Sequence, residues 1–116
     1  LRKDGLVESL ETVNEPDAEW KGNVGNVTDR NPKIDRGIDR DRTVVAACGP
    51  GKMMKAVVDR FTEAGFREEQ LLLSFERKMQ CGIGVCGHCM CGEKLICMDG
   101  PVMSVHDMRD TLEKIF

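Results

Sequence analysis

The chain has 116 residues, which is enough for one small domain or for part of a larger one. It carries 17 lysines and arginines against 20 aspartates and glutamates, and this net charge of -3 argues against nucleic acid as the main partner, because phosphate binding requires a basic surface. No apolar run approaches about 18 residues, so no membrane-spanning helix is predicted. Because the chain begins at Leu1 and shows no secretion signal, we expect part of a longer, cytoplasmic protein.

The first 43 residues carry weak structural signals. Residues 6–13 alternate imperfectly and are consistent with a strand, whereas the glycines and asparagines of residues 20–27 favour turns. Residues 28–43 are dense in Asp and Arg, which is typical of a solvated connection with at most a short helix. We favour that interpretation over a functional charge patch.

A strand–helix–strand unit follows. Residues 44–48 form a short, continuous apolar run, as expected for a strand buried on both faces. Residues 52–64 place apolar side chains at helical spacing, and Gly65 is suited to end that helix. Residues 71–75 form a second apolar run. The pattern predicts two parallel strands joined by a right-handed helical crossover.

This topology predicts where a ligand binds, because open parallel sheets bind ligands beyond the carboxyl ends of their strands. The first strand leads into the turn Cys48-Gly49-Pro50-Gly51, and the second leads through Glu76 and Arg77 into a cluster of cysteines. We therefore expect the turn and the cysteines to face a common gap. The turn alone is a weak signal, since no G-x-G-x-x-G that would hold a dinucleotide pyrophosphate is present.

Five of the six cysteines lie between Cys81 and Cys97. Such a dense cluster is typical of a metal site, whereas disulfide frameworks spread their cysteines along the chain. The spacing C-x4-C-x2-C-x7-C begins like a plant-type [2Fe–2S] loop, with Cys81, Cys86, Cys89 and Cys97 as the candidate ligands. Glycines between them permit the tight turns that direct backbone N–H groups at sulfur.

Other interpretations of the cysteines stay open. A structural zinc site is disfavoured because such sites usually use two short cysteine pairs, and only Cys86 and Cys89 form one. Disulfides are disfavoured by the clustering. A Rieske-type site with His88 or His106 as ligands is disfavoured because the cysteines already suffice. We expect Cys91 to be a small buried residue, with an additional ligand or a reactive thiol as the alternatives.

The C-terminal residues predict a helix. Ser104 and Asp107 have the spacing of a capping box with Ser104 as the N-cap. Val105, Met108 and Leu112 then fall on one helical face, together with Ile115.

Taken together, the motifs resemble the ferredoxin–NADP reductase superfamily. Cys48-Gly49-Pro50 followed by Met53-Met54 is similar to the C-G-P-x-x-M motif that lies beside the nicotinamide and the flavin ring in that superfamily. Residues 74–82 and 97–102 resemble the C-terminal module of one branch, which contains the electron-transfer subunit of dihydroorotate dehydrogenase B, the corresponding subunit of anaerobic sulfite reductase and the gamma subunit of sulfhydrogenase. Residues 20–25 resemble a segment of the last two.

The resemblance covers essentially the whole chain, but only the C-terminal part of such a protein. It implies an α/β fold in which residues 1–77 form the C-terminal portion of a Rossmann-like NAD(P)-binding domain with a parallel sheet. Residues 78–116 would form a [2Fe–2S]-binding loop module with a C-terminal helix. The implied cofactor-side residues are Cys48, Gly49, Pro50, Gly51, Met53 and Met54, and the implied cluster ligands are Cys81, Cys86, Cys89 and Cys97.

The implied function is electron transfer. Electrons would pass between NAD(P)H, flavin and a [2Fe–2S] cluster, and to or from a partner catalytic subunit that is a dehydrogenase, hydrogenase or reductase. FAD and NAD(P)H are expected in the full-length protein, and we expect the chain alone to show no turnover because the flavin-binding barrel and the pyrophosphate turn are missing. The alternative function is a non-enzymatic zinc-binding or iron–sulfur interaction module.

Overall fold

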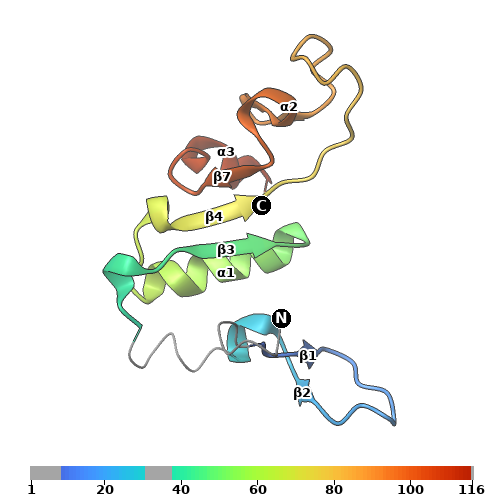
Figure 1. Cartoon of the computed structure of the whole chain (residues 1–116), viewed down its shortest axis with the longest axis vertical. Helices are drawn as coiled ribbons and strands as arrows, with labels where there is room; N and C mark the ends of the chain where they lie inside the picture. Colours follow the sequence, from blue (N-terminus) through green and yellow to red (C-terminus); the bar gives the residue numbers. More distant parts are fainter. Residues whose placement is uncertain (1–8, 31–37, 116) are drawn as a thin grey trace. The chain divides into compact units, whose positions relative to one another are not determined.

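The computed structural model describes residues 9–30 and 38–115 (Figure 1). The chain divides into two compact units, Leu1–Gly37 and Ile38–Phe116. Each unit is described by itself.

The first unit is built on a pair of very short strands. β1 (Thr12–Val13) pairs in parallel with β2 (Asn23–Val24), and a 3-10 helix follows at Val27–Arg30. The Thr12 hydroxyl donates a hydrogen bond to the Gly25 carbonyl at 2.9 Å, and the Trp20 indole N–H donates to the Asn23 carbonyl at 2.9 Å. The strand predicted over residues 6–13 is therefore confirmed at its end, while residues 6–8 lie outside the described part.

The second unit contains the predicted strand–helix–strand arrangement. β3 (Val45–Cys48) is followed by α1 (Gly51–Glu63) and by β4 (Leu71–Ser74), and the two strands are parallel. α1 packs against both strands (Figure 1). A third strand, β7 (Val102–Ser104), pairs antiparallel with β4 and gives the order β3-β4-β7. The α/β class is confirmed, and the sheet is mixed because the C-terminal segment supplies this third strand.

α1 ends where the sequence predicts, for an identifiable reason. Gly65 has a φ of +88°, and its N–H donates to the Thr62 carbonyl at 2.9 Å. The next N–H, of Phe66, donates to the Phe61 carbonyl at 3.0 Å. The rings of Phe61 and Phe66 meet edge to face with centroids 5.2 Å apart. Both the hydrogen bonds and the apolar contact are those of a Schellman motif, which satisfies the last carbonyls of the helix.

The two central strands differ in burial. Leu71, Leu73 and Phe75 are all buried in or directly after β4. In residues 44–48, by contrast, only Ala47 is buried and Val44 is 63% exposed. The prediction of a strand buried on both faces is therefore wrong for β3 in the described chain. β3 is an edge strand of this sheet, and its burial alternates along the strand, with Ala47 buried between the exposed Ala46 and Cys48.

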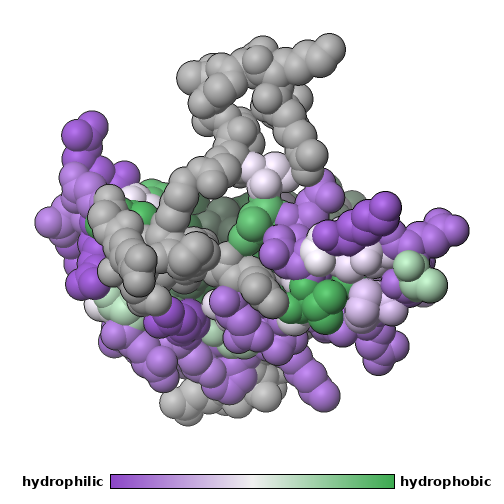
Figure 2. All heavy atoms as spheres, turned by 90° about the horizontal axis from the view of Figure 1, so that it is seen from below, coloured by the Kyte–Doolittle hydropathy of each residue, from purple (hydrophilic) through white to green (hydrophobic). Residues whose placement is uncertain are grey.

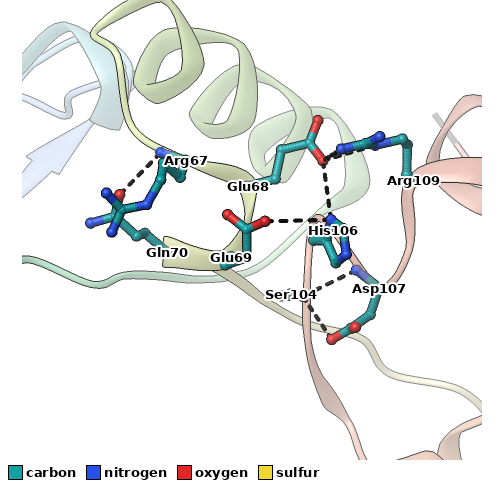
Figure 3. Close-up of polar contacts among 8 residues, drawn as sticks. All are labelled: Arg67, Glu68, Glu69, Gln70, Ser104, His106, Asp107 and Arg109. Atoms are coloured by element: carbon teal, nitrogen blue, oxygen red, sulfur yellow. Dashed lines mark hydrogen bonds and ion pairs between the residues drawn. The ribbon is translucent and has the colours of Figure 1, made fainter. Parts of the chain in front are cut away.

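The C-terminal helix begins later than the sequence predicts. The Asp107 N–H donates to the Ser104 hydroxyl at 3.1 Å, and that hydroxyl donates to the Asp107 carboxylate at 2.7 Å, which lowers the pKa of Asp107 (Figure 3). These bonds close a turn rather than the helix, because Ser104 is the last residue of β7 and is paired with β4. α3 starts at Arg109 and runs as Arg109–Ile115. Val105, Met108 and Leu112 are buried together as predicted.

Exposed ion pairs connect the start of β4 with the segment leading into α3 (Figure 3). The Glu68 carboxylate accepts from the Arg109 guanidinium at 2.9 Å, and His106 lies 3.5 Å from the Glu69 carboxylate. Both glutamates lie in the 3-10 helix Glu68–Gln70. Exposed pairs of this kind contribute about 0–1 kcal/mol each, so they orient the C-terminal segment more than they stabilise it.

Charged residues make up 32% of the chain, and hydrophilic side chains cover most of the coloured surface in Figure 2. The apolar areas on that face are small and separated from one another. Within residues 9–30 and 38–115, no helix is both long and apolar enough to cross a membrane.

A hairpin and a one-turn helix connect the cysteine loop to the C-terminal segment. β5 (Met90–Cys91) pairs antiparallel with β6 (Lys94–Leu95), and α2 (Ile96–Asp99) follows. At the hairpin turn Gly92 has a φ of +62°, and a Cβ added there would overlap the side chain of Thr111, which is buried on α3. The hairpin therefore packs backbone to side chain against the C-terminal helix.

Replacing Gly92 with alanine is expected to destabilise the fold more than replacing Gly65, which also has a positive φ. A left-handed alanine costs about 1–2 kcal/mol at either position. At Gly92 the overlap with Thr111 should add about 1–3 kcal/mol, whereas at Gly65 the nearest atom is the mobile tip of Arg40 at 3.4 Å. Urea unfolding of both variants measures the difference. Equal losses would show that Thr111 does not abut the turn.

Candidate metal centre and pocket

The cysteine loop depends on left-handed glycines. Gly82, Gly84 and Gly87 have φ values of +70°, +77° and +69°, and no non-glycine residue in the described chain has a positive φ. Residues with a Cβ rarely adopt such angles, so these positions let the loop reverse direction repeatedly. The prediction that glycines permit the tight turns between the cysteines is confirmed.

The first two cysteines receive backbone hydrogen bonds from within the loop. Cys81 Sγ accepts from the N–H groups of Ile83 at 3.5 Å and Cys86 at 3.4 Å. Cys86 Sγ accepts from the His88 N–H at 3.4 Å. Cys81 and Cys86 therefore form one pair, with N–H groups directed at sulfur as predicted.

The last two candidate ligands form a second pair. Cys97, on α2, donates its backbone N–H to Cys89 Sγ at 3.5 Å. Gly84 of the loop lies against the same turn, since a Cβ added there would approach Met98 Cγ to 2.9 Å. The loop and α2 therefore converge, and the four cysteines are connected as two pairs through backbone N–H groups. In the part of the chain that the structure describes, no three His, Cys, Asp or Glu side chains surround a single metal position.

The loop favours the thiolate at its first cysteine. The backbone N–H groups of Cys86, Ile83 and Val85 lower the pKa of Cys81 to about 6, because hydrogen bonds to the charged form stabilise it. In the second pair, the Cys97 N–H lowers the pKa of Cys89, whereas the hydrogen bond with Cys89 raises the pKa of Cys97. Since the thiolate is the form that binds metal, the hydrogen bonds to Cys81 favour metal binding there, whereas the raised pKa of Cys97 opposes it.

The two pairs differ in exposure. Cys81 and Cys86 are exposed, while Cys97 is intermediate and Cys89 is buried. The apolar residues Ile83 and Val85 are 69% and 78% exposed, because the backbone between them turns its N–H groups toward sulfur and its side chains toward solvent. The first pair therefore lies at the surface and the second lies against the hairpin and α2.

The remaining cysteine and histidine candidates lie elsewhere. Cys91 is 1% exposed, as expected for a small buried residue. His88 is exposed, and it contacts Cys86 through its backbone N–H. His106 lies beside Glu69 near the start of β4 (Figure 3).

A pocket of about 390 Å³ lies at the carboxyl ends of β3 and β4. The turn after β3 and the residues after β4 share it, as the parallel topology predicts. Its walls are formed by Cys48, Gly49, Pro50, Gly51, Met54, Ser74, Phe75, Glu76 and Arg77. Met53 is not among them; its side chain lies against Gly49, where an added Cβ would approach Met53 Cε to 2.5 Å. The four candidate ligands are not among the lining residues either.

Two of the lining residues, Ser74 and Phe75, were not predicted from the sequence to lie in a pocket. The signal that could have found them is their position, since Ser74 is the last residue of β4, Phe75 follows it, and the residues after a parallel strand line the binding edge. Phe75 is 2% exposed, so it forms the floor of the pocket rather than its rim.

Comparison with known proteins supports the interpretation of the cysteine loop. Residues 76–109 match the iron–sulfur cluster binding domain of dihydroorotate dehydrogenase B. The matched segment contains all four candidate ligands, Cys81, Cys86, Cys89 and Cys97.

Three relatives extend the similarity. Sulfhydrogenase 1 subunit gamma of Pyrococcus furiosus is 45% identical over 73 residues, which cover 60% of this chain and 25% of that protein. The probable dihydroorotate dehydrogenase B (NAD(+)) electron transfer subunit of Pyrococcus horikoshii is 42% identical over 67 residues, or 58% of this chain and 25% of that protein. The corresponding Listeria monocytogenes protein is 34% identical over 95 residues, or 76% and 34%.

The chain thus spans about a quarter to a third of the length of the curated relatives it matches. The resemblance that the motifs indicated is confirmed, and it is a resemblance to the C-terminal part of those proteins.

In the 116-residue chain with metal bound at the candidate ligands, we expect Cys48 to be the cysteine that iodoacetamide alkylates rapidly. Its thiol is exposed beside the pocket, whereas Cys91 is 1% exposed. Peptide mass spectrometry after a short pulse measures this, and Cys91 should react only in denaturant. Removing the metal should add the exposed Cys81 and Cys86 to the reactive set. Rapid labelling of Cys91 in the folded protein would contradict its burial.

Proposed function

We propose that Cys81, Cys86, Cys89 and Cys97 hold a [2Fe–2S] cluster, with Cys81 and Cys86 on one iron and Cys89 and Cys97 on the other. The observation that carries this proposal is the arrangement of the cysteines as two pairs, each joined by a backbone N–H that one cysteine donates to the sulfur of the other, on a loop and a turn that lie against each other. A two-iron cluster held by four cysteines needs two thiolates for each iron. A structural zinc ion instead needs four ligands around one point.

The backbone around the sulfurs also fits a cluster. N–H groups at 3.4–3.5 Å from Sγ contribute to the reduction potential of iron–sulfur centres, because they stabilise negative charge on sulfur. When bound, such a cluster exchanges one electron at a time. The chain's own contribution is to supply thiolates, to direct N–H groups at them and to leave the first pair near the surface.

We further propose that the chain is part of an electron-transfer subunit of an NAD(P)H-dependent flavoprotein. Two relatives are named as an electron transfer subunit and as a gamma subunit of a larger oxidoreductase, which supports a partner catalytic subunit. In this proposal residues 1–77 belong to a Rossmann-like NAD(P)-binding domain and residues 78–116 to the cluster module. FAD and NAD(P)H would be bound by the full-length protein.

The pocket supports a role for the turn after β3 beside the nicotinamide and the flavin. It lies at the carboxyl edge of the parallel strands, where α/β sheets bind ligands, and α1 begins at its wall with Gly51. The helix N-terminus carries a partial positive charge and free N–H groups, which suit an electron-rich group. Cys48, Gly49, Pro50, Gly51 and Met54 would form this side, with Met53 behind Gly49.

Metal analysis with single cysteine variants tests the cluster. Anaerobically purified protein should contain about two irons and two sulfides per chain, and Cys→Ser at position 81, 86, 89 or 97 should abolish or strongly reduce them. Cys91→Ser is the matched control, because Cys91 is a buried cysteine of the same segment outside the two pairs, and it should keep the cluster. Stoichiometric zinc without sulfide would refute the proposal, as would loss of iron in Cys91→Ser with retention in Cys97→Ser.

Variants of the pocket turn test the nucleotide side in the full-length protein. Cys48→Ala and Gly49→Val should slow flavin reduction by NAD(P)H by roughly 10–100-fold, because small displacements of a bound reactant have effects of that size. The visible spectrum of the cluster should not change. Lys55→Ala, on the exposed side of α1, is the control. An unaltered rate in Gly49→Val would show that the turn has only a structural role.

A further inference from the structure

Asp99 closes the short turn that carries the fourth candidate ligand. Its carboxylate Oδ2 accepts a hydrogen bond from the Leu95 N–H at 2.7 Å. This bond joins the residue two positions before Cys97 to the residue two positions after it. The segment that presents Cys97 is therefore closed into a small ring by one side chain.

The turn needs such support because it is very short. α2 comprises only Ile96–Asp99, and a helix of this length does not persist through its own hydrogen bonds. Leu95 precedes it with extended backbone and no side-chain cap, and Gly100 leaves it with a φ of +94°. The backbone thus changes direction at both ends of the turn, and the Asp99 carboxylate spans these two changes.

Beside the backbone bond from the Gly100 N–H to the Ile96 carbonyl at 3.1 Å, two contacts of the turn lead directly to the second cysteine pair. The Ile96 N–H donates to the Cys89 carbonyl at 3.3 Å, and the Cys97 N–H donates to Cys89 Sγ at 3.5 Å. The Ile96 side chain is 3% exposed and anchors the turn in the core. If the turn unwinds, both N–H groups leave Cys89 and the Cys97 thiol leaves the pair.

A second carboxylate, in the hairpin that precedes α2, provides a comparison. Glu93 is exposed, like Asp99, and it lies four residues before Cys97. Its side chain has no hydrogen bond or ion pair with the described residues. Glu93 therefore adds negative charge to this region without closing the turn.

We propose that Asp99 is a positioning residue for Cys97, which it holds as the fourth cluster ligand through its hydrogen bond to the Leu95 N–H. This inference rests on the proposed function, since it takes Cys97 as a ligand. Asp99 does not itself bind the metal. Its negative charge also disfavours adding an electron to a centre held by its neighbour, so its neutralisation shifts the reduction potential to a more positive value.

The experiment compares the full-length protein with four variants: Asp99→Ala, Asp99→Asn, Glu93→Ala and Glu93→Gln. Asp99→Ala removes both the acceptor and the charge, whereas asparagine keeps an acceptor oxygen and loses only the charge. Iron release to a colorimetric chelator reports how firmly the fourth ligand is held. Redox titration and the electron paramagnetic resonance spectrum of the reduced protein report on the cluster itself.

Asp99→Ala should release iron at least about tenfold faster than the wild type, as expected for the loss of a charged acceptor from a backbone N–H. Asp99→Asn should restore slow release while its reduction potential moves to a more positive value. Both Glu93 variants should release iron at the wild-type rate. If Asp99→Ala does not accumulate, the restored retention in Asp99→Asn still tests the hydrogen bond.

Several outcomes would overturn the inference. Iron release from Asp99→Ala at the wild-type rate would do so, as would equally fast release from Asp99→Ala and Glu93→Ala, which would indicate a general charge effect. Fast release from Asp99→Asn would remove the hydrogen bond as the cause. Wild-type protein with zinc and no sulfide would refute the proposed function and this inference with it, whereas wild-type protein with iron and sulfide isolates the role of Asp99.

Discussion

One hydrogen bond at the base of the cysteine loop organises the second unit. The Phe75 N–H donates to the Pro101 carbonyl at 2.7 Å, directly beyond the point where Ser74 of β4 pairs with Val102 of β7. Residues 76–100, between Phe75 and Pro101, form one segment that leaves the sheet and returns to it at the same place. The cysteine loop, the hairpin and α2 are therefore anchored to the sheet at this one place, although they contain little regular structure.

The place where this segment leaves the sheet also connects the candidate metal centre to the pocket. The pocket is lined in part by Phe75, Glu76 and Arg77, which are also the first residues between β4 and the cysteine loop. A change in the part of the pocket wall that follows β4 therefore also changes the segment that connects the cysteine loop to the sheet. The two sites are connected through a few residues of backbone, without any of the four candidate ligands entering the pocket.

Local signals were sufficient to predict α1, the parallel strands and the cysteine spacing. α1 has its own stripe of apolar side chains at helical spacing and its own terminating glycine, Gly65. The spacing of the candidate ligands is likewise set by residues close in sequence. What the sequence alone did not predict depends on distant partners. Val102–Ser104 is too short to be recognised as a strand without β4 beside it, and because it is paired, Ser104 does not begin the helix. The alternating burial of β3 likewise depends on which elements cover its two faces. For the candidate site, the spacing of the cysteines indicated four candidate ligands, but their division into pairs became visible only in the structure.

The position of β7 has a consequence for assembly. β3, α1 and β4 are consecutive, so this unit can form from contacts that are close in sequence, whereas β7 joins β4 only after a loop of roughly 27 residues has closed, at an entropic cost on the order of 3 kcal/mol. A group bound by cysteines at both ends of the segment 81–97 shortens that loop in advance. Under the proposed function, metal loading and completion of the sheet would therefore be thermodynamically linked, because each would lower the free energy needed for the other.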